Sequence, residues 1–145
     1  MKKAIGLAMG LMTLLLLCGC ETERNNMESA TVGTVMVING VTDADVWLLP
    51  DTQANRKTTV WGIATAAQVK TGESRSTSLC EAGDDGAYLL RAIDTNGFYY
   101  SADGVALHDG WTVKITETEP MSAALEVTDE YGAPQHTYDV FVARL

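Results

Sequence analysis

The stretch AYLLRAIDTNGFYYSA, residues 87–102, decides the fold that this sequence predicts. Residues 87–94 are mostly apolar and contain Tyr, Leu and Ile, which is a composition typical of a β-strand. Residues 94–97 read Asp-Thr-Asn-Gly, and an Asn-Gly pair accepts the positive φ angles of a tight hairpin turn. The aromatic run in 98–102 then supplies the returning strand. The stretch therefore predicts an antiparallel hairpin.

Short segments of the same kind recur along the chain, with turn residues about every 8 to 12 positions. The segments that predict strands are 32–38, 45–49, 74–80, 87–94, 98–102, 105–107, 111–116, 123–128 and 137–145. Residues 51–59 are polar and predict a loop, whereas 61–69 fit either a short helix or a strand. We expect an all-β domain, either an antiparallel β-sandwich or a small open barrel, of about eight or nine short strands.

Two of the expected turns contain an aspartate followed by a glycine. Asp103 and Gly104 are expected to turn the chain, and residues 108–110, His-Asp-Gly, to join 105–107 and 111–116 as a hairpin. The final strand is apolar to its last residue, so we expect the C-terminus to be part of the sheet.

The chain begins with a pattern that differs from all of these segments. Lys2 and Lys3 are followed by an apolar run over residues 5–17. A run of about 13 residues is too short to span a hydrocarbon core of about 30 Å comfortably, but it suits the apolar centre of an export signal. An uncleaved membrane anchor, an ordinary secretory signal and a buried helix are the alternatives.

The apolar run ends in Leu17, Cys18, Gly19 and Cys20, which resembles the lipobox of bacterial lipoproteins. Gly19 supplies the small residue before the cysteine, and Leu17 stands three positions before it. Cys18 departs from the usual Ala, Ser or Thr, and Leu17 is too bulky to precede a cleavage site at Cys18. The resemblance implies that Cys20 becomes the first residue of the mature protein and carries a diacylglycerol.

This interpretation divides the chain into a signal peptide (1–19), a lipidated cysteine with a flexible tether (20–31) and one β-domain (32–145). The resemblance implies a place on the extracytoplasmic side of a membrane. Because Glu21, and not Asp, follows Cys20, the outer membrane is expected in a cell with two membranes. The cell membrane is expected where there is only one.

Charge and cysteine content restrict the partners. The net charge is −9, and loss of Lys2 and Lys3 leaves eight basic and nineteen acidic residues, near −11. We therefore expect no nucleic acid and no anionic lipid surface as a partner, but membrane lipid through acylated Cys20. Cys80 is the other cysteine of the mature chain, so no intrachain disulfide is expected, and a structural role is favoured over a reactive one.

A second resemblance rests on strands and turns. Its positions are Asn39, Pro50, Trp61, Gly62, Gly72, Glu73, Ser74, residues 88–93, residues 94–97, Tyr99 and residues 107–110. In this order they resemble a loosely defined set of small bacterial lipoprotein and secreted β-domains. The resemblance covers roughly 80 of about 126 mature residues. It implies a fold and carries no activity.

The sequence offers little for catalysis. His108 and His136 lie outside any catalytic signature and are expected in solvated turns, so we assign no catalytic residue and no enzymatic activity. Acidic turn residues could supply oxygen ligands to calcium, namely Asp84, Asp85, Asp94, Asn96, Asp103 and Asp109. The same residues suit tight turns without a metal. We assign no metal site and no cofactor, and the calcium question stays open.

Aromatic residues are the remaining candidates for binding. Tyr99 and Tyr100 are adjacent in an expected strand, so their side chains should point to opposite faces, with one of them exposed. Core packing explains most aromatic residues, but an exposed ring on a sheet could bind carbohydrate or protein. We expect a membrane-anchored, non-enzymatic binding or envelope-structural β-domain. The alternative is a calcium- or carbohydrate-dependent adhesion domain.

Replacing Cys20 tests the lipobox. Cys20→Ala removes the sulfur that forms the thioether, so we expect loss of palmitate labelling and accumulation of the unprocessed precursor. Cys18→Ala is the matched control and should be labelled and processed like the natural chain. Labelling that persists in Cys20→Ala would contradict the assignment.

Overall fold

The computed structural model describes residues 30–145; the predicted signal peptide, Cys20 and most of the expected tether lie outside these residues. The strands of the described part are β1 (Thr31–Gly40), β2 (Ala44–Pro50), β3 (Ala66–Val69), β4 (Ser74–Cys80), β5 (Ala87–Asp94), β6 (Phe98–Ala106), β7 (Thr112–Glu119), β8 (Ser122–Thr128) and β9 (Pro134–Arg144). Two short helices accompany them, α2 (Gln53–Lys57) and the 3₁₀-helix η1 (Asp84–Gly86). Neither helix of residues 30–145 is long and apolar enough to cross a membrane.

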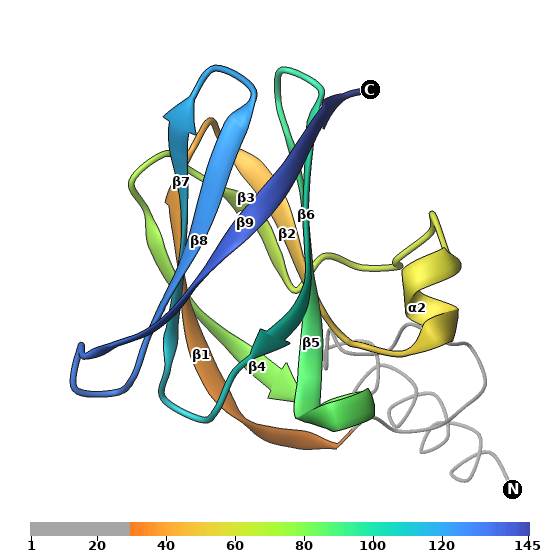
Figure 1. Ribbon diagram of the computed structural model, residues 1–145, viewed down its shortest axis with the longest axis vertical. Coiled ribbons are helices and arrows are strands. Elements are labelled where there is room, and N and C mark those ends of the chain that lie inside the picture. Colours follow the sequence, from red (N-terminus) through yellow and green to blue (C-terminus); the bar gives the residue numbers. More distant parts are fainter. Residues whose placement is uncertain (1–29) are drawn as a thin grey trace, which may run out of the picture.

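The nine described strands form one sheet in the order β3-β2-β5-β6-β9-β8-β7-β1-β4. The sheet curls until its two end strands, β3 and β4, meet, which gives a nearly closed barrel (Figure 1). The prediction of an all-β fold is confirmed, and the small barrel is the architecture that forms. The neighbouring strands pair in antiparallel fashion except β1 and β7, which run parallel.

Alternation along the strands fills the barrel. In β1, for example, Val35 and Val37 are buried while Thr34 is exposed. The apolar core is built from Val and Leu of all nine strands and from smaller residues. Its fully buried members are Val35, Val37, Val46, Leu48, Val69, Leu79, Leu90, Val105, Ile115 and Leu125.

The buried side chain of Asn39 holds the ends of the sheet together. Its amide nitrogen donates to the carbonyl oxygens of Thr42 (2.9 Å) and Val69 (2.8 Å), and its oxygen accepts from the backbone N–H of Val41 (3.0 Å). The Asn39 backbone N–H donates to Glu73 O at 3.1 Å. Asn39 thereby links the β1–β2 turn to the end of β3 and to the β3–β4 turn.

Side chains of β4 complete this closure. The Arg75 guanidinium donates to the carbonyl oxygens of Ala67 and Gln68, and the Thr77 hydroxyl donates to Thr65 O at 2.8 Å. No residue pairing of a backbone ladder joins β3 to β4 in the described part of the chain. Side-chain hydrogen bonds therefore join β3 to β4, whereas backbone hydrogen bonds join the other neighbouring strands of the barrel.

The polar stretch 51–59, predicted as a loop, contains the short helix α2. The Thr52 hydroxyl accepts from the Asn55 N–H at 3.1 Å, which is an N-cap, and so begins the helix. The ambiguous segment 61–69 becomes a strand only over β3.

One predicted turn and one predicted hairpin are wrong, although the chain does turn at residues 108–110, where the Trp111 N–H donates to His108 O at 3.1 Å. Asp103 and Gly104 lie inside the continuous strand β6, where the register with β5 shifts and Gly104 has φ +66°. Asp103 and Gly104 form a β-bulge: β6 has one more residue than β5 at this point, which bends the strand without ending it. The predicted hairpin of 105–107 with 111–116 does not form either, since β7 pairs with β1 and β8.

The link between β6 and β7 is instead attached to β1. The Asp109 carboxylate accepts from the Thr34 N–H at 2.8 Å, and the Gly110 N–H donates to Thr34 O at 2.7 Å. These bonds direct the chain across the barrel end to β1. The predicted hairpins β5–β6 and β8–β9 are present, and Leu145 N–H donates to Gly97 O, so the C-terminus is bound to the sheet.

Asn39→Ala should destabilise the barrel more than any exposed Asn→Ala change. It leaves the buried groups of Val41, Thr42 and Val69 without these bonds, so we expect a loss of about 2–4 kcal/mol in the free energy of unfolding. Urea denaturation measures it. Asn96→Ala is the matched control, because Asn96 is exposed and its amide reaches only Thr42, at 3.5 Å. Equal losses in both variants would refute the role of Asn39.

Candidate functional site

Residues 51–65, with α2, lie outside the barrel (Figure 1), and an apolar layer of buried side chains lies on the outward face of β2 and β5. Leu49 and Leu89 face each other in register and are fully buried, although their neighbours Leu48 and Leu90 belong to the barrel core. Alternation places Leu49 and Leu89 on the outward face. The outer face of this half of the sheet is therefore partly covered.

Four aromatic side chains continue this layer across the sheet, and we call them the aromatic row: Trp47, Trp61, Tyr99 and Phe141. The ring centroids of Trp47 and Trp61 are 5.3 Å apart, and those of Trp61 and Tyr99 are 5.8 Å apart with planes inclined by 14°. Tyr99 and Phe141 meet edge to face at 6.5 Å. The rings come from β2, the loop after α2, β6 and β9, so the row crosses the sheet and Trp61 bridges the position of β5.

Strand alternation explains why Tyr99 joins the row. Tyr99 points outward, whereas Tyr100 is buried and its hydroxyl donates to the Asp94 carboxylate at 3.0 Å. The prediction that these two side chains face opposite ways is confirmed. Burial, reinforced by the hydrogen bond to Asp94, raises the pKa of Tyr100 above its usual value, so its hydroxyl stays protonated.

Both indole rings of the row are fixed by hydrogen bonds to the loop that follows α2. Trp47 Nε1 donates to Gly62 O at 3.2 Å, and Trp61 Nε1 donates to Thr58 O at 3.1 Å. The polar edge of each indole is thus occupied within the protein, one face of Trp61 stacks on Tyr99, and the remaining ring carbons are left for contact. Rings that are already held in place lose little conformational entropy when a ligand binds.

The row is accompanied by exposed apolar side chains. Phe141 is 63% exposed, and Val60 and Ile63, which flank Trp61 in the sequence, are 75% and 57% exposed. Isolated exposed apolar residues are ordinary, but a contiguous group indicates an interaction surface. This face is the strongest candidate for a functional site in the described residues.

Four charged side chains hold residues 51–65 against the sheet, and we call them the charged clamp: Asp51, Arg56, Arg91 and Asp103. Arg56 donates two bonds to the Asp51 carboxylate, from Nε at 2.5 Å and from Nη2 at 2.8 Å. Buried Arg91 pairs with Asp103 at 2.8 Å. The Asp51 side chain is only 3% exposed and also accepts from the Gly104 N–H at 2.9 Å. The clamp thus ties α2 to β5 and to the bulge in β6.

The Arg56 guanidinium lowers the pKa of the Asp51 carboxyl, and the Gly104 N–H adds to this effect against the opposing effect of burial. Beside the clamp lies a shallow cavity of about 530 Å³ that the exposed carboxylates of Asp84 and Asp85 also line. Asp51 is neutralised by Arg56, so the cavity holds no buried carboxylate poised for proton transfer.

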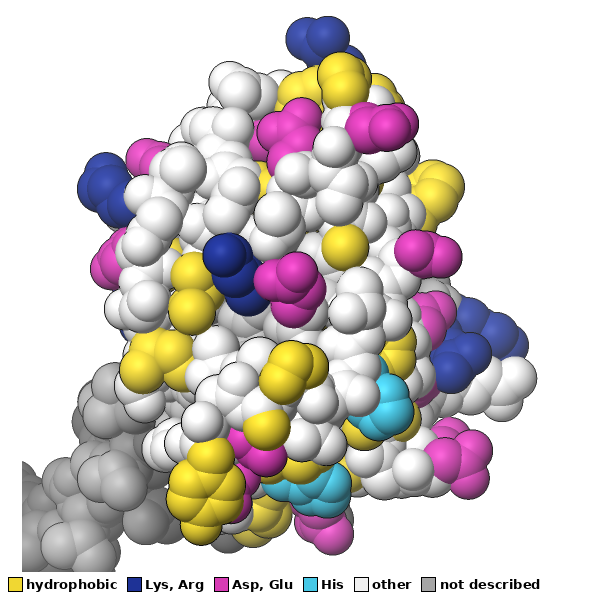
Figure 2. Space-filling model, turned by 60° about the vertical axis from the view of Figure 1, so that its left-hand side comes forward, with side chains coloured by type: hydrophobic (Ala, Val, Ile, Leu, Met, Phe, Trp, Pro, Cys, Tyr) yellow, Lys and Arg dark blue, Asp and Glu magenta, His cyan; other side chains and the backbone are white. Residues whose placement is uncertain are grey.

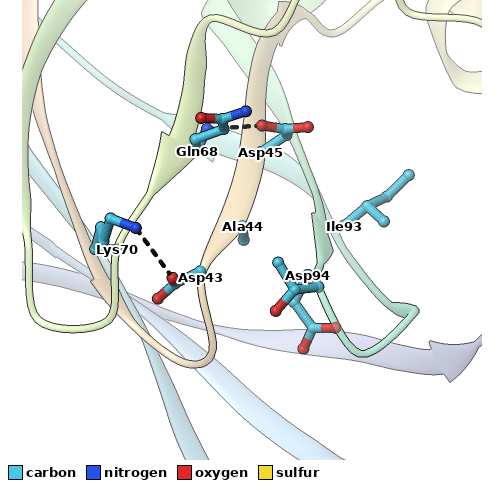
Figure 3. A pocket seen from close by; sticks show the side chains of 8 residues that line it. Asp43, Ala44, Asp45, Gln68, Lys70, Ile93 and Asp94 are labelled. Atoms are coloured by element: carbon cyan, nitrogen blue, oxygen red, sulfur yellow. Dashed lines mark hydrogen bonds and ion pairs between the residues drawn. The ribbon is translucent and has the colours of Figure 1, made fainter.

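A second cleft, of about 350 Å³, lies between β2, β3 and the β5–β6 turn (Figure 3). Its polar groups bind one another or the backbone: Asp43 pairs with Lys70 at 3.7 Å, and Asp45 accepts from the Gln68 N–H at 2.7 Å. The Thr71 N–H, which donates to Asp43, lowers the pKa of that carboxyl. These carboxylates stabilise turns and do not form an acid–base pair.

The structure disperses the acidic residues considered for calcium. Asp94 is buried and accepts from the N–H groups of Asn96 and Phe98, both at 2.9 Å, as well as from Tyr100. Asp109 binds Thr34, and Asp103 binds Arg91. Within residues 30–145, no group of three or more His, Cys, Asp or Glu side chains is arranged to hold a metal ion.

The histidines and the cysteine do not share a surface. His108 and His136 are exposed. His108 meets Trp111 edge to face with ring centroids 4.5 Å apart, and the ring of His136 is tilted against that of Tyr138 at 5.8 Å. Figure 2 shows histidine side chains at the surface, among scattered charges of both signs. Cys80 is buried, and its carbonyl oxygen accepts from the Tyr88 hydroxyl.

Sequence reasoning identified the aromatic residues and the opposite directions of Tyr99 and Tyr100, of which Tyr99 is only partly exposed, but neither the row nor the clamp. The row needs the path of residues 51–65, which no local pattern encodes. One signal for the clamp was present: Thr52 and Asn55 mark a capped helical turn between Asp51 and Arg56, which brings an acid and a base together.

Comparison of the chain with protein-family models, with curated proteins and with solved structures found no match.

Asp51→Asn should weaken the attachment of α2. The change removes the negative charge that Arg56 faces, and we expect a loss of about 1–3 kcal/mol in the free energy of unfolding at neutral pH. Because the folded pKa of Asp51 is lowered, its contribution is present above the unfolded pKa, about 3.9, and is lost as the pH falls through the folded value. Urea denaturation between pH 7 and pH 2 should therefore show the gap between natural chain and variant closing in acid. Asp139→Asn, at an exposed position of β9, is the control. A gap that is constant with pH would contradict the role of the Asp51 charge.

Proposed function

We propose that this chain is a lipid-anchored, extracytoplasmic lipoprotein whose β-barrel is a non-enzymatic binding domain. The aromatic row is the observation that carries the binding role. Trp and Tyr concentrate the energy of binding surfaces because they combine large apolar area with low conformational entropy. The row is pre-organised, continuous and partly exposed.

The anchor in this proposal is acylated Cys20. A diacylglycerol contributes two chains, and two chains hold a protein on a bilayer stably. Ten residues separate Cys20 from Thr31, and a fully extended segment of that length reaches about 35 Å at most. The domain would thus work close to the outer membrane of a two-membrane cell, or to the cell membrane where there is only one.

The arrangement of nucleophiles and bases supports the non-enzymatic part. Catalysis by a thiol needs a thiolate and a base within hydrogen-bond reach. Cys80 is buried, and His108 and His136 are exposed. The carboxylates of Asp51, Asp94 and Asp103 are bound by hydrogen bonds or ion pairs of the fold itself.

The alternative is an adhesion domain that depends on either carbohydrate or calcium. The aromatic row favours its carbohydrate form, because flat aromatic surfaces suit sugar rings. The calcium form has no comparable support, since the acidic residues that suggested it serve turns and ion pairs.

Site-specific photo-crosslinking in cells tests the binding role. A photoreactive phenylalanine analogue at Phe141, the most exposed ring of the row, should form an adduct with an envelope component. The same analogue at Tyr131 is the matched control, because Tyr131 is 87% exposed and lies in the β8–β9 turn, away from the row. Trp61→Ala should abolish the adduct from position 141. No adduct at 141, or equal adducts at 141 and 131, would refute the proposal.

A further inference from the structure

We propose that the aromatic row binds a neutral, linear carbohydrate chain by stacking of sugar rings on its aromatic faces. This inference rests on the proposed function, because it names the ligand class of that same face. It follows from three properties of the row: its shape, the chemistry of its surface and its charge.

The shape of the row suits a chain and not a rounded partner. Its four rings follow one another across β2, β5, β6 and β9, each within 6.5 Å of the next. They lie on the outward face of a sheet, and Trp61 fills the one strand position without an outward ring. The result is a narrow strip of successive contact points, which a linear polymer can follow unit by unit.

The chemistry of the strip favours C–H groups over hydrogen-bonding edges. An aromatic face carries a negative quadrupole and attracts weakly positive C–H groups, which one side of a pyranose ring presents. The indole N–H groups of Trp47 and Trp61 are already bound to Gly62 and Thr58, and Trp61 stacks on Tyr99, so a ligand meets the ring carbons that this stack leaves uncovered. Ser101 lies in register with Phe141, and its hydroxyl can form hydrogen bonds with the hydroxyl groups at the edge of a sugar ring.

The charge of the site favours a neutral ligand. The Tyr99 hydroxyl is the only ionisable group of the row. The charges of the clamp neutralise each other as Asp51–Arg56 and Arg91–Asp103. The carboxylates of Asp45 and Asp139 stand two positions before Trp47 and Phe141 on the same face of β2 and β9, which disfavours an anionic ligand. The net charge of −9 repels anionic polysaccharides, and it equally opposes a second copy of the chain on this face.

Intrinsic fluorescence provides the test, because two of the three tryptophans lie in the row. The full chain carrying Trp111→Phe, purified in a detergent without a sugar headgroup, reports only from Trp47 and Trp61. It is titrated with neutral oligosaccharides of glucose, mannose, xylose and N-acetylglucosamine linked in linear chains, and with oligogalacturonate as the anionic probe. We expect a saturable change with at least one neutral series, and an affinity that rises with chain length.

The row should account for this binding. In the same background, Phe141→Ala should weaken the affinity at least about tenfold, because a few aromatic side chains carry most of the energy of a binding surface and Phe141 is the most exposed ring of the row. Phe141 is exposed, so the change should not disturb folding. Tyr131→Ala, which removes an exposed ring elsewhere, should leave the affinity unchanged.

Three results would overturn the inference: no saturable change with any neutral series, equal binding of the anionic probe, or equal affinities of Phe141→Ala and Tyr131→Ala. A protein adduct from position 141 combined with no glycan binding would also overturn it. That last outcome leaves the proposed binding function standing, whereas failure of both experiments removes both.

Discussion

The fold depends on a single buried amide, that of Asn39. A sheet of nine strands with unpaired ends would expose two edges, but the Asn39 side chain bonds the turn after β1 to the end of β3. Both amide hydrogens and the amide oxygen of this side chain take part in hydrogen bonds, so neither buried polar atom of the side chain lacks a partner. Arg75 and Thr77 extend the closure along β4. The rigid outer surface of the barrel is possible because this join is stable.

The outer surface adds a second level of organisation. Residues 51–65 leave the barrel after β2 and return to it at β3, and Leu49 and Leu89 on the outward face of β2 and β5 are buried. The charged clamp fixes the start of this segment, while the two indole hydrogen bonds fix its middle. The aromatic row is therefore composite, with three rings from the barrel and Trp61 from the covering segment. Neither part forms the row alone.

The sequence predicted what local chemistry determines. The strand over 87–94, the Asn-Gly turn and the opposite directions of Tyr99 and Tyr100 depend on neighbours in the chain, and all three are found in the structure. The sequence around Gly104 does not distinguish a turn from a bulge, because both use a glycine with positive φ. Pairing with β5 decides between them, and it gives a bulge. The crossing from β6 to β7 is set by the bond between Asp109 and Thr34, whose residues lie 75 positions apart. The aromatic row could not be predicted for the same reason, because its four rings come from residues far apart in the sequence.

The composite origin of the row has an evolutionary consequence. The barrel rings are constrained by strand register, since a shift of one position would turn each side chain to the other face. Trp61 is subject to no such constraint, because loops outside the core tolerate insertion and replacement. Changes of length or residue in 58–63 would thus alter which shapes the row accepts, while Thr65 and its bond from Thr77 keep the barrel closed. Diversification of specificity among descendants of this domain should concentrate in that short segment.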